Sequence, residues 1–141
     1  MTAREQRAAA SAASSLEDLL GALIVCGEVH LVVKNAGATA ELRGEARLSI
    51  GEEWLTIELV GTPDHLHVRR AALTGAGFLT EASKNHGVCF LGEEGQPVLT
   101  CRLPGTAEGR PGYSAERRAA FDAVEASHRG ALWRRRSEAG S

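Results

Sequence analysis

Cysteines are few in this sequence, and none has the spacing of a metal or redox motif. The 141 residues include Cys26, Cys89 and Cys101, with no Cys-x-x-Cys pair among them. An odd number of widely spaced cysteines predicts neither a disulfide framework nor a structural zinc site. We therefore expect the chain to work in a reducing compartment, the cytoplasm.

Long apolar runs and a secretory pattern are also missing. The longest apolar runs, such as 19–26 and 31–33, are too short and too interrupted to cross a bilayer. The Ala- and Ser-rich start has no continuous apolar core like that of a signal peptide. The sequence thus predicts a soluble chain with no membrane span, in which residues 1–13 form a disordered N-terminal segment.

Neither sign of charge dominates, because the formal net charge is only -2 at pH 7. A chain that neutralises nucleic-acid phosphates carries a basic footprint, so we expect no nucleic-acid partner. Enzyme signatures are absent too: there is no phosphate-binding loop, no Gly-x-Ser-x-Gly elbow and no Gly-x-Gly-x-x-Gly fingerprint. The sequence therefore predicts no catalytic residue.

The composition is that of an ordinary globular domain, with 43% hydrophobic and 24% charged residues. A chain of this length can bury one core without disulfides or metals. We expect a single α+β domain over residues 14–133, followed by a solvated tail at 134–141.

Helices are predicted at both ends of this domain. Ser14 and Glu17 have the spacing of a capping box, and an apolar stripe at helical spacing follows and stops before Gly27. Ser114 can cap the last helix. The stripe of the first helix consists of Leu16, Leu19, Leu20, Leu23 and Ile24, and the buried line of the last of Phe121, Val124, His128 and Leu132.

Alternating segments between the helices predict strands at 29–33, 39–42, 46–50, 54–60 and 65–69. We interpret those from 39 onward as a meander. Residues 71–80 predict a short helical turn or an irregular connection, because Gly75 and Gly77 interrupt the alanines. Segments 88–91 and 98–103 flank a Gly-Glu-Glu-Gly turn and predict a hairpin. The fold class is therefore α+β, with a twisted, mostly antiparallel sheet and a helix at each end.

His65 and His67 are the most informative residues for function. Their spacing places both imidazoles on one face of a strand, with Cα atoms about 7 Å apart, opposite Leu66 and Val68. A neutral imidazole can bind haem iron axially, and His-x-His on a strand can also hold zinc or another divalent metal. The alternative is that both are simply exposed strand residues.

Arg69, Arg70 and Trp54 could complete a ligand site around the histidines. A guanidinium at the rim of an apolar pocket suits a carboxylate such as a haem propionate, although a solvated strand end explains the arginines equally well. Trp54 points away from the apolar face of its strand and lines either a second packed face or a pocket. His86, in Asn85-His86-Gly87, is predicted to be a turn residue.

Several segments of the sequence follow one another in a characteristic order: 40–44, 54–59, 65–68, 78–79, 89–91, 94–95 and 97–103, and then the last helix. This arrangement resembles that of the ChuX, HutX and HemS group of cytoplasmic haem-utilisation proteins, especially its shorter bacterial relatives. That group's pattern has a Gly-His-Ile strand, and His67 falls on its histidine. Longer members carry a further histidine upstream, in a His-x-His-Gly-Tyr-Phe segment, where this chain has Gly51-Glu52-Glu53-Trp54.

The resemblance implies a twisted antiparallel sheet flanked by helices, often assembled as a homodimer, that carries haem in the cytoplasm. It implies His67 as the iron ligand and His65 as a neighbouring or alternative ligand. Our leading hypothesis is a non-catalytic haem-binding or haem-trafficking protein, whose two imidazoles reach an apolar hollow rimmed by cations. Two alternatives stay open: a metal-dependent enzyme that uses His65 and His67 with a carboxylate such as Asp64 or Glu58, and a cofactor-free homodimeric binding module.

Overall fold

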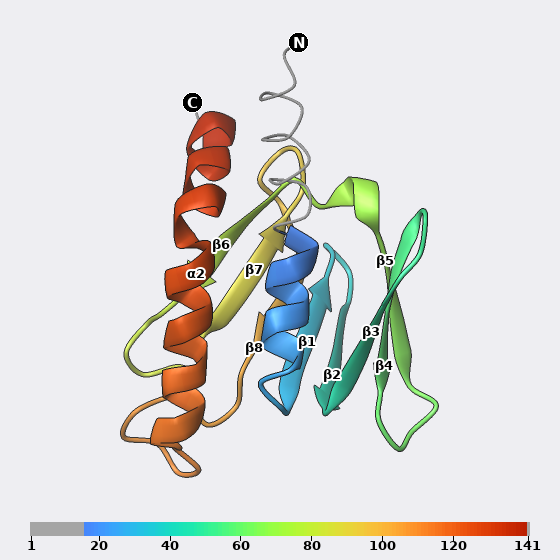
Figure 1. Ribbon diagram of the computed structural model, residues 1–141. Helices are drawn as coiled ribbons and strands as arrows, with labels where there is room; N and C mark the ends of the chain where they lie inside the picture. The colour runs from blue at the N-terminus through green and yellow to red at the C-terminus, as the bar shows by residue number, and fades with distance from the viewer. Residues whose placement is uncertain (1–15, 141) are drawn as a thin grey trace.

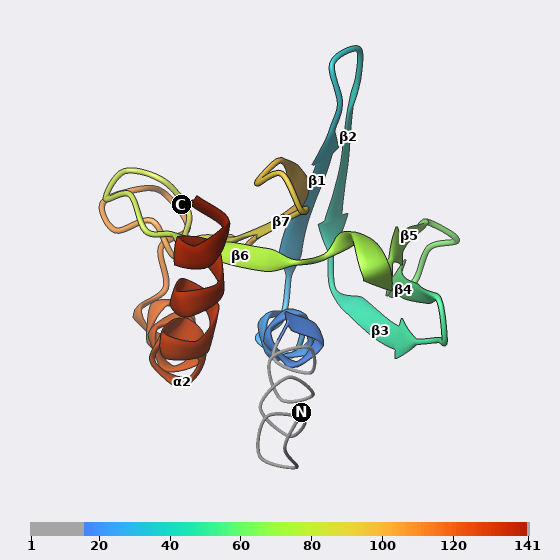
Figure 2. The ribbon, with the colours of Figure 1, turned by 90° about the horizontal axis from the view of Figure 1, so that it is seen from above.

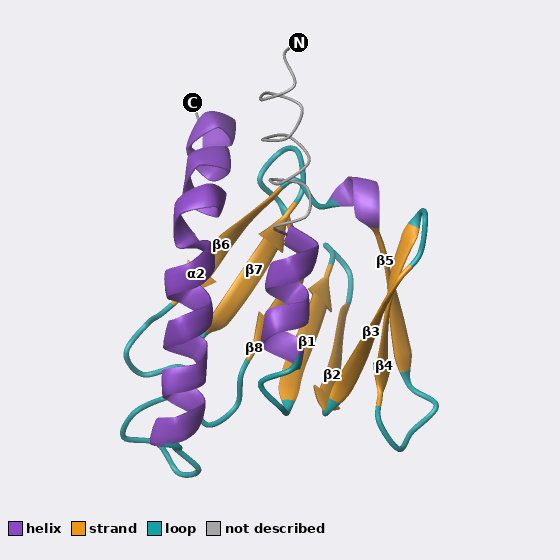
Figure 3. Cartoon of the chain, in the orientation of Figure 1, coloured by secondary structure: helices purple, strands orange, loops and turns teal. Residues whose placement is uncertain are grey.

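A computed structural model describes residues 16–140, and it has the α+β architecture that the sequence predicts. A helical segment at 16–24 and the helix α2 (Ala115–Gly140) lie on the same side of a five-stranded sheet (Figure 1, Figure 3). The other elements are β1 (Val29–Lys34), β2 (Thr39–Gly44), β3 (Ala46–Ile50), β4 (Trp54–Leu59), β5 (His65–Arg69), the 3-10 helix η1 (Arg70–Ala72), β6 (Gly75–Leu79), β7 (Gly87–Leu91) and β8 (Pro97–Arg102).

The strands form two sheets, in the orders β2-β1-β8-β7-β6 and β3-β4-β5, and every strand pair is antiparallel. The predicted meander is therefore wrong at its first member, because β2 pairs with β1 and not with β3. The chain leaves one sheet for the other at Gly44, where φ is 150°. Glycine reaches such angles without steric cost, so this position can redirect the chain between two strands.

The core lies between the two helices and the inner faces of both sheets. The apolar stripe of the segment 16–24 is buried, as predicted, while Ser14 of the expected capping box lies outside the described residues. This stripe packs with Leu31 and Leu99 of the larger sheet and with Leu55 and Ile57 of the smaller one. Because the two sheets share one core, the opposite face of the β3-β4-β5 sheet is turned outward (Figure 2).

The segment 71–80 is the clearest error of the sequence-based assignment, because Gly75–Leu79 form the edge strand β6. Ala76 and Phe78 face the core, where the Phe78 ring lies 6.3 Å from that of Phe121. Gly75 and Gly77 occupy the alternate positions of the strand, and pairing with β7 holds it in place. Packing and pairing here override the weak strand preference of glycine.

The last elements agree with prediction. The Gly92 N–H donates to the Gln96 carbonyl (2.8 Å) and closes the β7-β8 hairpin. The Ser114 hydroxyl accepts from the Arg117 N–H (3.2 Å) at the start of α2. The side chains of the expected tail at 134–141 lie outside the described residues, so its solvation stays a prediction. None of the described helices is both long and apolar enough to span a bilayer.

Candidate functional site

Six side chains share the outer face of the β4-β5 pair, and we call this set the histidine face. Strand β5 alternates as predicted, with Leu66 half-buried and Val68 buried on the inner side. Cross-strand register sets each outward residue of β5 opposite one of β4. The pairs are Trp54 with Arg69, Thr56 with His67, and Glu58 with His65.

Both imidazoles are held through their Nδ1 atoms. The Nδ1 of His67 lies 2.9 Å from the Thr56 hydroxyl. The Nδ1 of His65 lies 3.0 Å from the carbonyl oxygen of Pro63, which can only accept, so His65 donates this bond. The two rings are 4.9 Å apart, and no described residue hydrogen-bonds to either Nε2. A metal-binding imidazole uses one nitrogen as ligand and fixes the other by such a bond, so both rings are suitably restrained.

Trp54 and Arg69 extend the histidine face beside His67. The Trp54 ring lies 6.4 Å from the His67 ring, edge to face, and the guanidinium of Arg69 lies 4.8 Å from the Trp54 ring centre. Arg69 also pairs with Glu53 at 3.1 Å. Since Trp54 is 41% exposed, an aromatic ring and a cation stand side by side at the surface. Such a pair can stack on a flat ligand and bind its carboxylate.

Arg70 does not join the histidine face. Its guanidinium donates to the Glu17 carboxylate (2.6 Å) and to the Gly51 carbonyl (2.7 Å). These bonds tie the helical segment 16–24 to the turn before β4. The structure thus brings together four of the five predicted haem-binding residues and gives the fifth a structural partner.

We expected an apolar, cation-rimmed hollow beside the histidines. The structure has a hollow of this kind, but it does not lie beside them. His65 and His67 are exposed and share their face with polar Thr56 and Glu58. The hollow lies on the outer side of the five-stranded sheet, measures about 280 Å³, and does not include either histidine. It is lined by Val32, Lys34, Leu79, Cys89, Pro97, Val98, Leu99, Thr100 and Arg102, and we call it the outer hollow. Alternation along a strand shows which residues share a face but not whether that face is concave.

The carboxylates expected near the histidines do not complete a metal site. Across the described residues, no three His, Cys, Asp or Glu side chains are grouped so as to hold a metal ion. Neither Asp64 nor Glu58 therefore supplies a third ligand to His65 and His67. Metal binding by the two histidines alone stays a prediction.

His86 is the residue whose environment sequence reasoning missed. It is 2% exposed, and neither ring nitrogen finds a hydrogen-bond partner among the described residues. The ring packs edge to face on Phe121, with centroids 5.4 Å apart. Burial, followed by the nearby Arg118, lowers the pKa of His86 below its ordinary value. A turn-like Asn-His-Gly segment gives no sign of this burial, because the covering helix comes from far along the chain.

The fold of this chain is similar to that of ChuX. Two solved structures of ChuX, one of them described as a heme-binding protein, align with a TM-score of 0.68 at 17% sequence identity. These alignments cover 83% and 82% of this chain and 74% and 73% of ChuX. A protein from Agrobacterium tumefaciens aligns with a TM-score of 0.67 at 14% identity, over 82% of this chain and 68% of that protein.

No protein-family model matches the sequence, and no curated protein matches it either. The antiparallel fold that the sequence resemblance implied is confirmed by these structural alignments. At such low identity a shared fold does not carry a shared function, which has to be argued from the site.

Proposed function

We propose that this chain is a non-catalytic haem-binding protein in which His67 would be a ligand of the iron. The observation that carries the proposal is the histidine face on a ChuX-like fold, where an imidazole whose Nε2 has no partner among the described residues lies beside an aromatic ring and a cation. The role extends, as the sequence resemblance implies, to haem trafficking in the cytoplasm.

The residues of the histidine face fit a haem in three respects. His67 offers Nε2 while Thr56 restrains Nδ1, which is the arrangement of an imidazole ligand. Trp54 offers an aromatic ring for stacking on the macrocycle. Arg69 offers a guanidinium for a propionate, and releasing its exposed pair with Glu53 costs little. Haem would supply the iron and its redox chemistry, while these side chains bind and orient it.

The same face is open to water, so a second wall is needed to exclude solvent from a bound haem. The outer hollow, at about 280 Å³, is slightly smaller than the 300–1,000 Å³ typical of ligand pockets, and it lies on the other sheet. We infer that a second copy of the chain supplies the wall, which makes the haem-bound form a homodimer.

Titration with hemin tests the ligand directly. We expect wild-type protein to shift the Soret band of hemin and to saturate at a defined stoichiometry. His67→Ala should lose the shifted band or bind hemin at least tenfold more weakly, because the iron loses its axial nitrogen. His30→Ala is the matched control, since His30 lies on β1 and pairs with Glu41 at 2.9 Å.

Equal hemin spectra and affinities for wild type and His67→Ala would remove His67 from this role. Metal analysis of the purified protein distinguishes haem binding from the alternative of a metal-dependent enzyme. Stoichiometric zinc or iron without porphyrin, lost in His65→Ala and His67→Ala, would favour a metal-dependent enzyme instead.

A further inference from the structure

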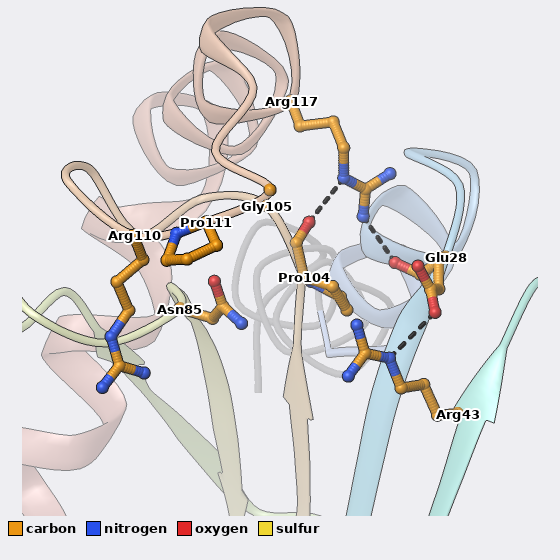
Figure 4. Close-up of a pocket in the computed structure, with 9 residues that line it drawn as sticks. Glu28, Arg43, Asn85, Pro104, Gly105, Arg110, Pro111 and Arg117 are labelled. Atoms are coloured by element: carbon orange, nitrogen blue, oxygen red, sulfur yellow. Dashed lines mark hydrogen bonds and ion pairs between the residues drawn. The ribbon is translucent and has the colours of Figure 1, made fainter.

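A second cavity lies on a different part of the molecule, between the loop that precedes α2 and the ends of β1 and β2. It measures about 600 Å³, within the range of small-molecule sites. Figure 4 shows the side chains around it. Its lining consists of Glu28, Arg43, Asn85, Pro104, Gly105, Arg110, Pro111, Gly112 and Arg117, and we call it the arginine cavity.

The charges of the arginine cavity do not balance. Three arginines line it, and Glu28 is its one carboxylate, already 2.9 Å from Nε of Arg43. Arg110 is exposed and has no ion-pair partner among the described residues. Among the described residues, two positive charges of the lining are thus left without a counterion, those of Arg117 and of Arg110, which lie on opposite sides of Pro111 and Asn85 (Figure 4). The N-terminal end of α2 adds to the positive potential.

The walls of the cavity are fixed by hydrogen bonds. Arg117 donates to the carbonyls of Pro104 (2.6 Å), Cys26 (3.0 Å) and Glu28 (2.6 Å), which joins the loop before α2 to the start of β1. Asn85 accepts from the Ala107 N–H (3.2 Å) through Oδ1. Its amide nitrogen has no partner among the described residues and remains a donor at the cavity wall (Figure 4).

We infer that the arginine cavity binds a small molecule through a phosphate group. A phosphate monoester carries between one and a half and two negative charges at neutral pH, which matches the two uncompensated guanidinium charges. The planar fork of arginine binds phosphate oxygens in pairs, and a neutral amide donor can complete the set. The volume beyond one phosphate leaves room for the rest of the molecule. This site is separate from the histidine face and independent of haem.

Isothermal titration calorimetry at fixed ionic strength tests the inference with inorganic phosphate, pyrophosphate and succinate as probes. We expect one site per chain for phosphate or pyrophosphate, with succinate binding at least fivefold more weakly. Arg110→Gln and Arg43→Gln should each weaken phosphate or pyrophosphate binding at least fivefold. Arg47→Gln removes the same charge from exposed β3 and should leave binding unchanged.

Absence of binding by wild type, or equal affinities for wild type and Arg110→Gln, would overturn the inference. Succinate binding as tightly as phosphate would overturn the phosphate assignment. Arg110 is exposed, so Arg110→Gln should fold normally and keeps the test decisive even if Arg43→Gln is unstable. Hemin titration of Arg110→Gln should match that of wild type, so the phosphate site and the haem site can fail separately.

Discussion

Among single residues, His86 has the least ordinary environment. A buried imidazole with no hydrogen-bond partner among the described residues is tolerated in its neutral form, because burial penalises the charged form most. The charged groups around it are Arg118, Asp122 and Glu125 of α2 and Arg102 of β8, of which the arginines oppose protonation and the carboxylates favour it. The net effect on the pKa of His86 is a lowering.

The lowered pKa of His86 predicts a loss of stability in mild acid. As the pH falls below about 6.5, the unfolded chain binds a proton at His86 that the folded protein does not bind. The free energy of unfolding therefore decreases with falling pH. Above pH 6.5 His86 is neutral in both the folded and the unfolded chain, so this loss of stability is absent. Urea denaturation of wild type and His86→Leu between pH 5 and pH 7.5 measures this pH dependence of stability.

As the pH falls, we expect the free energy of unfolding to decrease less for His86→Leu than for wild type, because the variant has no imidazole at this position to protonate on unfolding. Parallel pH profiles for wild type and His86→Leu would show that His86 does not titrate differently on folding.

Two glycines of the larger sheet, Gly87 and Gly75, differ in the space that an added side chain would have. A Cβ at Gly87 would overlap the carbonyl oxygen of Cys101 on β8, whereas a Cβ at Gly75 would meet no atom of the described residues within 4 Å. Gly87→Ala should lower the free energy of unfolding by about 3 kcal/mol, as overpacking against backbone does. Gly75→Ala should leave it unchanged or raise it by about 0.5 kcal/mol. Urea denaturation checks both, and equal stabilities would contradict the close approach at Gly87.

The elements that could be predicted are those with local signals. The strand β5 follows from alternation alone, and the β7-β8 hairpin from glycines between two apolar segments. Strand β6 could not be predicted, because its stability comes from pairing with β7 and from packing of Phe78 on Phe121. That β2 and β3 belong to different sheets could not be predicted either, because strand partners depend on contacts across the whole chain.

At the scale of the whole molecule, the sequence predicted that the two histidines share one face, as they do, and that they reach an apolar hollow, whereas the outer hollow includes neither of them. The pairing of Thr56 with His67 depends on the register of β4 and β5, which no local pattern fixes. The arginine cavity was equally hidden, because Arg43, Arg110 and Arg117 meet only after folding. The face on which a residue lies could thus be predicted from the sequence. Whether that face is hollow, and which residues from other segments lie beside it, could not.

The open histidine face leads to a prediction about assembly. If a second copy covers the haem, sedimentation velocity should show a dimer for the hemin-loaded protein. His67→Ala mixed with hemin should contain less of this dimer, because the ligand that joins the two copies to the haem is lost. A strictly monomeric, fully hemin-loaded wild type would contradict the role of the second copy while leaving His67 as a possible ligand.

The central claim is that Nε2 of His67 binds haem iron, and exchange of the ligand tests it most directly. Electron paramagnetic resonance and absorbance spectra of ferric haem distinguish nitrogen from thiolate ligation, because the axial ligand sets the electronic state of the iron. We predict a nitrogen-ligated spectrum for wild type and a thiolate-ligated spectrum for His67→Cys, with His65→Cys unchanged from wild type. The same nitrogen-ligated spectrum in His65→Ala and in the double variant His65→Ala, His67→Cys would contradict the account, because His65 can then no longer replace the lost imidazole.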